Sequence, residues 1–254
     1  MSPNTRKPLI VGNWKMHKTI AETRAFVAEV RALSLPLDDV DAVICPPFTA
    51  LCAARDALAE SGIGLGAQNV CWADRGPFTG EISPPMLTEC GVRWVVIGHS
   101  ERRALFGELD FRVHEKAVAA LAHEITPIVA VGETAEEHAA GQALDRVCTQ
   151  LRAAFDGMPV IDVARCVVAY EPIWAIGTGH ADTPESANAI MGEMRVAIPG
   201  LEHAHLLYGG SMKPDNVAAF VAQPNIDGGL VGGASLEPGS FAALLHGARE
   251  GANT

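Results

Sequence analysis

The stretch VVAYEPIWAIGTGH, residues 167–180, joins a β-strand pattern to a glycine-rich loop through a single carboxylate. It opens with a short apolar run led by β-branched residues, a pattern typical of a strand buried on both faces. Glu171 follows directly, and Pro172 then closes the strand pattern. A carboxylate in that place either pairs with a buried arginine or is available for chemistry, so the ends of other strands bear on its role.

The chain contains eight apolar runs of this kind, each ending in polar residues or glycine. The runs start at Leu9, Asp41, Ile63, Trp94, Pro127, Cys166, His205 and Gly228. Segments with helical spacing of apolar residues lie between them, at 19–33, 50–62, 83–91, 110–123, 183–198 and 213–223. Buried strands that alternate with helices predict an α/β fold with a parallel sheet.

Eight such units in 254 residues favour a closed eight-stranded parallel sheet, the (β/α)8 barrel. A doubly wound open sheet is the alternative. The chain shows no Pro/Ser-rich linker and no low-complexity block, so the sequence predicts a single domain over residues 1–254.

Composition excludes several function classes. Acidic residues outnumber basic ones by 30 to 19, for a net charge of -11, which argues against nucleic-acid binding. The sequence shows no signal peptide and no apolar run long enough to cross a membrane. The six cysteines form no C-x-x-C pair and are expected to be reduced thiols. We therefore expect a soluble cytoplasmic protein.

Polar residues and glycines follow several of the predicted strands. They are Asn13 and Lys15, His99, Ser100 and Glu101, Glu171, Gly209, Gly210 and Ser211, and Gly232 and Gly233. In a (β/α)8 barrel these strand ends surround the active site. Glu171 is a candidate general base, His99 a proton donor, and Lys15 a fixed positive charge. Glycines after the seventh and eighth strands let backbone N–H groups approach a phosphate.

Each of these residues also has a structural interpretation. Glu171 could pair with an arginine, His99 could cap a helix, Lys15 could be solvated, and the glycines could serve turns. The sequence carries no metal-ligand motif and no dinucleotide-binding motif, so we expect neither a metal nor a cofactor. Taken alone, the residues indicate a phosphate-binding barrel with acid and base groups.

From end to end the chain resembles the triosephosphate isomerase family. The matching motifs are GNWKM (12–16), AQN (67–69), FTGEIS (78–83), VIGHSERR (96–103), AYEPIWAIGTG (169–179), YGGS (208–211) and GLVGGASL (229–236). The resemblance implies a TIM barrel that interconverts dihydroxyacetone phosphate and glyceraldehyde 3-phosphate through an enediolate, without a cofactor. A related isomerase acting on a four-carbon erythrulose phosphate, and a non-catalytic binding module, are the alternatives.

The resemblance also implies residue roles. Glu171 would abstract the carbon-bound proton and His99 would polarise the carbonyl group. Lys15 and Asn13 would stabilise the oxyanion, and Glu101 would orient Lys15 or help relay protons. Ser100 would hold Glu171 in the empty site. The residues implied for binding the substrate and its phosphate are Asn13, Lys15, Gly177, Ser211, Gly232 and Gly233.

Two loops complete the resemblance. Residues 172–176 would begin a mobile lid, whose far hinge departs from the usual family pattern at 180–182. Segment 68–81 resembles a loop that inserts into a second subunit, which would place Thr79 near the partner's site in a homodimer. The apolar residues Val70, Trp72 and Phe78 would otherwise be exposed, unless this loop folds over its own barrel.

Overall fold

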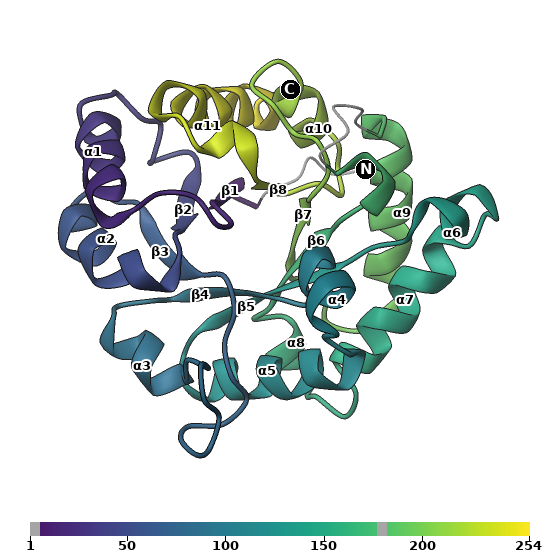
Figure 1. The fold of residues 1–254 in the computed structure, drawn as a ribbon. Helices are drawn as coiled ribbons and strands as arrows, with labels where there is room; N and C mark the ends of the chain where they lie inside the picture. Colours follow the sequence, from purple (N-terminus) through teal and green to yellow (C-terminus); the bar gives the residue numbers. More distant parts are fainter. Residues whose placement is uncertain (1–5, 177–181) are drawn as a thin grey trace.

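The computed structural model describes residues 6–176 and 182–254. Eight parallel strands form a closed barrel in chain order, and the helices surround it (Figure 1). The strands are β1 (Leu9–Asn13), β2 (Asp41–Cys45), β3 (Gly64–Ala67), β4 (Trp94–Ile97), β5 (Thr126–Val131), β6 (Val167–Tyr170), β7 (His205–Tyr208) and β8 (Gly228–Val231). Since β1 pairs with both β2 and β8, the sheet closes and the open doubly wound alternative is wrong.

Helices and short 3₁₀ turns connect the strands. They are α1 (Ile20–Arg31), η1 (Phe48–Ala50), α2 (Leu51–Leu58), α3 (Pro84–Glu89), α4 (Ser100–Phe106), α5 (Asp110–Ala122), α6 (Ala135–Ala139), α7 (Ala143–Ala154), α8 (Val160–Val163), η2 (Ile173–Ala175), α9 (Pro184–Ala197), α10 (Val217–Val221), η3 (Gly233–Ser235) and α11 (Pro238–Ala252). Among the helices of the described ranges, none has the length and apolar character that a membrane crossing requires.

Alternation along the strands divides the buried residues into two clusters. The cluster inside the barrel comprises Leu9, Val11, Val43, Cys45, Val96, Ile128, Ala130, Val167, Ala169, Leu207 and Leu230. The larger cluster lies between the outer face of the sheet and the helices, and includes Ile10, Ile44 and Ile97. Because successive strand residues point to opposite faces, the strands other than β3 supply both clusters, which accounts for their nearly continuous apolar runs. In β3 the outer cluster receives Leu65 and Ala67, and the alternate positions are glycines.

Two predicted helices have different ends from those that the sequence pattern suggested. Helix α2 ends at Leu58 rather than at Gly62, because Ala59 already leaves the helical conformation. Helix α10 begins at Val217 rather than at Lys213, because the Asn216 side chain accepts the Lys213 N–H and forms a turn before the helix. Helices α4, α6, α7, α8 and α11 lie outside the segments for which a helix was predicted.

Gly132 occupies the interior position that follows β5, where no side chain fits. A Cβ atom there would lie 1.7 Å from the carbonyl oxygen of Glu171. We expect Gly132→Ala to lower the free energy of unfolding by about 3 kcal/mol or more, because β5 and β6 must separate to admit the methyl group. Urea denaturation measures this loss. Gly239→Ala is the control, since a Cβ atom there meets nothing within 4 Å. Equal stability of both variants would contradict the expected clash.

Candidate active site

Strand alternation explains how two polar residues reach the mouth of the barrel. In β6 the interior residues are Val167 and Ala169, so the next interior position falls on Glu171. By the same count Asn13 follows the interior residues of β1. Both side chains are buried, with relative exposures of 2% for Glu171 and 6% for Asn13. The carboxylate therefore ends its strand because the barrel interior opens there.

Glu171 is held by two neighbours from the end of β4. His99 Nε2 lies 3.1 Å from Glu171 Oε1, and the backbone N–H of Ser100 donates to Oε2 at 3.0 Å. His99 is also the N-cap of α4, where its Nδ1 accepts the Glu101 N–H at 3.2 Å. Since Nδ1 accepts this bond, the ring proton is on Nε2 and points to Glu171. His99 therefore both caps α4 and contacts Glu171 in the site.

Opposing influences set the ionisation of this pair. Burial by itself raises the pKa of Glu171, but His99 and the Ser100 N–H outweigh burial and lower that pKa below its usual range. Burial lowers the pKa of His99, but the carboxylates of Glu171 and Glu101 outweigh it and raise that pKa. The Glu101 N–H at Nδ1 acts against this rise, because only an unprotonated Nδ1 can accept it. Movement of Glu171 away from the ring would remove the largest influence that raises the His99 pKa.

Lys15 lies beside this pair in the loop after β1. Its Nζ donates to Glu101 Oε1 at 2.6 Å, so its interpretation as a freely solvated lysine is wrong. The Lys15 backbone has a φ of 52° and donates its N–H to Asn13 Oδ1 at 3.1 Å. Gln68 donates to the Lys15 carbonyl oxygen at 2.8 Å. With Oδ1 engaged, the Asn13 amide nitrogen is the group that can donate to a ligand.

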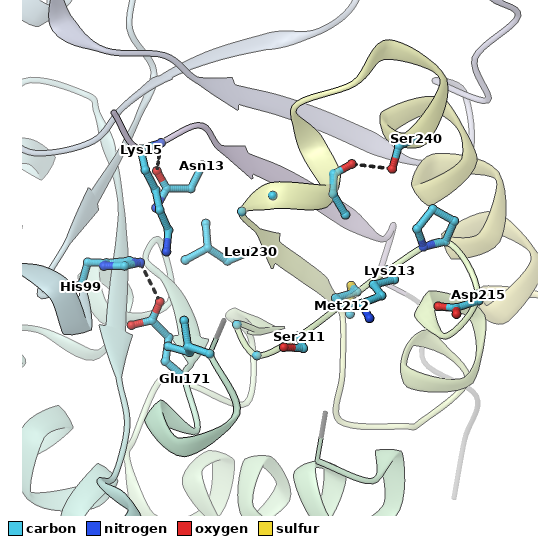
Figure 2. A pocket seen from close by; sticks show the side chains of 17 residues that line it. Asn13, Lys15, His99, Glu171, Ser211, Met212, Lys213, Asp215, Leu230 and Ser240 are labelled. Atoms are coloured by element: carbon cyan, nitrogen blue, oxygen red, sulfur yellow. Dashed lines mark hydrogen bonds and ion pairs between the residues drawn. The ribbon is translucent and has the colours of Figure 1, made fainter. Parts of the chain in front are cut away.

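A cavity of about 740 Å³ opens at this end of the barrel. The predicted site residues that line it are Asn13, Lys15, His99, Glu171, Gly209, Gly210, Ser211, Gly232 and Gly233. Figure 2 shows Lys15, His99 and Glu171 gathered on one side, with Met212 and Lys213 on the other. Charged and hydrogen-bonding groups therefore face one another across a space large enough for a small metabolite.

The glycines that line the cavity do more than form turns, because they make room for neighbouring groups of the site. A Cβ atom at Gly209 would lie 2.7 Å from Glu171 Cγ, so this glycine makes room for the carboxylate. A Cβ atom at Gly232 would lie 3.9 Å from Lys15 Nζ, which brings the backbone of that glycine close to the ammonium group. The Ser211 hydroxyl donates to the Ala175 carbonyl oxygen at 2.7 Å and ties the loop after β7 to the segment that follows Glu171.

Some predicted residues fall elsewhere, and some lining residues were not predicted. Glu101 does not line the cavity; it contacts Lys15 and the His99 ring from behind. Gly177 lies outside the described residues, as do two of the three residues at 180–182. The third, Asp182, donates its N–H to the Tyr208 hydroxyl at 3.0 Å.

Leu230 and Lys213 line the cavity, although the sequence patterns did not identify either residue. Strand alternation could have identified Leu230, since it precedes Gly232 by two residues.

The partners of Glu171 decide between its two interpretations. They are His99 and Ser100, so a buried pairing with arginine is not what holds this carboxylate. Among the residues that the structure describes, no group of three or more His, Cys, Asp and Glu side chains is arranged to hold a metal ion.

The lowered pKa of Glu171 predicts acid-sensitive stability. On unfolding, the carboxyl group regains its ordinary pKa of 4.5, so its ionised form favours the folded state. That stabilisation is complete above the ordinary value and is lost as the pH falls through the lowered folded value. The difference in free energy of unfolding between the native protein and Glu171→Gln should therefore shrink as the pH falls below 4.5. Urea titrations at several pH values measure it, and a difference that grows toward acid would contradict the lowered pKa.

Comparison with known proteins agrees with this geometry. The family model described as triosephosphate isomerase matches residues 8–248. A triosephosphate isomerase of Chloroflexus aurantiacus is 50% identical over 247 residues, which cover 95% of this chain and 99% of the relative. Those of Symbiobacterium thermophilum and a Roseiflexus species are 49% and 48% identical, and cover 96% and 95% of this chain and 98% and 97% of the relatives. The chain belongs to the triosephosphate isomerase family.

Proposed function

We infer that this chain is a glycolytic and gluconeogenic isomerase that interconverts dihydroxyacetone phosphate and D-glyceraldehyde 3-phosphate. The observation that carries the inference is the buried Glu171 carboxylate, 3.1 Å from His99 Nε2 in a cavity that Lys15 also lines. The matched relatives are named triosephosphate isomerases, so an isomerase for a four-carbon sugar phosphate is not favoured. We propose the residue roles below from the geometry of the site.

Glu171 is the base that abstracts the carbon-bound proton. Its ionised form accepts hydrogen bonds from His99 Nε2 and from the Ser100 N–H, which favour the deprotonated carboxylate. To reach a substrate carbon the carboxylate must exchange its contact with His99 for one with the substrate. The enediolate then recovers its proton at the neighbouring carbon from the same carboxyl group.

His99, Asn13 and Lys15 stabilise the negative charge that develops on the substrate oxygens. The Nε2–H of His99 donates once Glu171 has moved toward carbon, and the Glu101 N–H at Nδ1 favours the neutral ring. Asn13 donates through its amide nitrogen, and the bond from the Lys15 N–H to its oxygen fixes the orientation of the amide group. Lys15 adds a full positive charge that Glu101 holds in place at 2.6 Å. Glu101 is therefore a positioning residue that acts through Lys15 and His99.

The loops after β7 and β8 bind the substrate phosphate. Ser211, Gly232 and Gly233 line the cavity, and their backbone N–H groups are proposed as the phosphate donors, with Gly177 as a further donor. Lys15 Nζ lies near Gly232, so one cation serves both the phosphate and the oxyanion. Residues 172–176 begin the lid that closes over this site. Closure excludes water and protects the enediolate, a process for which this enzyme family is a standard example.

A homodimer is proposed through segment 68–81 and the loops beside it. Figure 1 shows the chain between β3 and α3 extending away from the barrel wall, and Thr79 in this segment is exposed. The expectation that Val70 would be exposed is wrong, because it is fully buried, while Trp72 and Phe78 are half-buried against each other. Two exposed apolar side chains are proposed to supply the contact instead: Met16 in the loop after β1, with 94% exposure, and Phe106 at the end of α4, with 68%.

Sedimentation velocity tests the dimer. The double variant Met16→Asp and Phe106→Asp should sediment as a monomer at micromolar concentration, because two charges would face an apolar partner surface. Val196→Asp is the matched control, since Val196 is 83% exposed on α9 and should leave the dimer intact. A native protein that is monomeric, or a double variant that stays dimeric, would overturn this interface.

The chain is also proposed to be one domain, 1–254, that acts in the cytoplasm. The described residues form one closed barrel with its surrounding helices, which supports a single domain. All six cysteines are free thiols, as is usual in a reducing compartment.

A coupled isomerase assay tests the reaction. The kcat/KM for glyceraldehyde 3-phosphate should approach the diffusional limit of about 10⁸–10⁹ M⁻¹ s⁻¹. Triosephosphate isomerases are a standard example of enzymes that reach this limit. A four-carbon ketose phosphate measured in parallel should react far more slowly. Glu171→Gln purified in the same way controls for a contaminating isomerase. Preference for the longer sugar would move the protein to another pathway, and activity on neither would reject the function.

A further inference from the structure

Two cysteines outside the active site lie in direct contact. Cys52 in the first turn of α2 and Cys90 at the C-cap of α3 have their Sγ atoms 3.2 Å apart, although they are 38 residues apart in sequence. Cys52 is exposed and Cys90 is half-buried. Two thiols at this distance need only a small movement to reach bonding distance, and one of them is open to solvent.

The other four cysteines differ from this pair in access. Cys45, Cys71, Cys148 and Cys166 are all buried. Burial raises the pKa of the Cys45 and Cys166 thiols to about 12, which makes them poor nucleophiles at neutral pH. A thiol reagent in solution therefore meets Cys52 first.

An arginine borders the thiol pair. Arg55, one turn after Cys52, donates to the Glu89 carbonyl oxygen at 3.2 Å, so its side chain crosses the end of α3. Burial and the contact with Cys52 raise the pKa of Cys90 to about 11, while the positive charge of Arg55 acts in the opposite direction. Cys52 is thus the thiol that attacks an oxidant, and Cys90 is placed to attack Cys52 afterwards.

We propose that Cys52 and Cys90 form a reversible thiol–disulfide site on the outer surface of the barrel, with low-molecular-weight disulfides such as glutathione disulfide as the oxidant. The Cys52 thiolate attacks glutathione disulfide, forms a mixed disulfide and releases one glutathione thiolate. The Cys90 thiolate then attacks Cys52 Sγ and releases the second. Both thiol protons pass to the released glutathione, so the protein loses two electrons and glutathione disulfide gains them.

Oxidation would join α2 to α3 and close a loop of chain around β3 and segment 68–81. Closing a loop of this length restricts the unfolded chain and should stabilise the folded protein. The site does not line the catalytic cavity, so its effect falls on stability and on the segment that we propose for dimer contact. The mobility of that segment would then depend on the thiol redox state.

Mass spectrometry of the full-length protein in glutathione redox buffers tests the proposal. Glutathione disulfide should remove two hydrogen atoms without leaving an adduct, and peptide mapping should join Cys52 to Cys90. Excess reduced glutathione should restore the thiols. The oxidised protein should unfold at a temperature higher by roughly 5 °C or more.

Single variants separate the two thiols. Cys90→Ser should retain one glutathione on Cys52, because no second thiol displaces it, and Cys52→Ser should react slowly at Cys90. Both variants should keep the activity of the reduced protein. A stable glutathione adduct on the native protein, a disulfide between other cysteines or between two chains, or no reaction in any buffer would overturn the proposal.

Discussion

Replacement of Glu171 by glutamine is expected to lower kcat by about 10³-fold or more, with the barrel intact. An amide of nearly the same shape cannot accept the carbon-bound proton, and general base catalysis contributes about 10²–10⁴-fold. The side chain keeps its volume in a site that is 2% exposed, so no cavity forms. One hydrogen bond is lost, because the amide oxygen replaces only one of the two carboxylate oxygens that accept from His99 and Ser100. Steady-state kinetics with circular dichroism measure activity and fold together.

Two further variants sharpen this result. Glu171→Asp keeps the carboxylate but withdraws it by about one bond, and misplacement of this size costs about 10²-fold. Glu29→Gln removes an exposed carboxylate from α1 and should leave kcat unchanged. Near-normal turnover of Glu171→Gln would show that another group is the base.

Replacement of Lys15 by methionine is expected to lower kcat/KM by about 10³-fold. Methionine has a similar length but removes the charge that faces the oxyanion and the phosphate, and loss of one such donor costs about 10²–10³-fold. Glu101 would also lose its partner at 2.6 Å. Both kcat and the affinity for a competing phosphate ester should fall, since Lys15 serves the two ends of the substrate.

Lys18→Met is the matched control for this experiment. Lys18 lies in the same loop and also has a positive φ, of 73°, but its amine sits over the Trp14 and Phe26 rings rather than in the cavity. The control therefore carries the same backbone strain and the same loss of charge. A comparable loss of activity in both variants would show that net charge, rather than the placement of Lys15, is what matters.

The strand pattern was the most informative part of the sequence. All eight apolar runs became strands, because strands buried on both faces of a sheet consist of short, nearly continuous apolar runs. Helix ends were less predictable. The side chain of Asn216 competes with the helix for a backbone N–H, and the outcome of such competition depends on packing that the sequence does not display.

Helix α7 illustrates a signal that was present but unused. Its buried residues include Val147, Cys148, Leu151 and Ala154, which follow helical spacing. The short helices α6 and α8 offer too few turns for such periodicity, so their existence depends on the loops around them.

The site was predictable only in part. Strand ends identified Asn13, His99 and Glu171 because parallel strands bring their carboxyl ends to one mouth. The pairing of Lys15 with Glu101 joins residues 86 positions apart; the family resemblance implied it, but local sequence patterns alone cannot determine such a contact. The sequence also did not reveal why position 209 requires glycine. Only the folded barrel shows that a methyl group there would clash with the Glu171 side chain.

The two-residue alternation in β6 has a consequence for how this protein can change over generations. Insertion or deletion of one residue before Glu171 would turn the carboxylate toward the surrounding helices and abolish the site in a single step. The exposed tip of segment 68–81 belongs to no strand, so an inserted or deleted residue there does not reverse the direction of the side chains that follow. Length variation should therefore accumulate in loops of that kind, while the strands admit exchanges of one residue for another but no change in number.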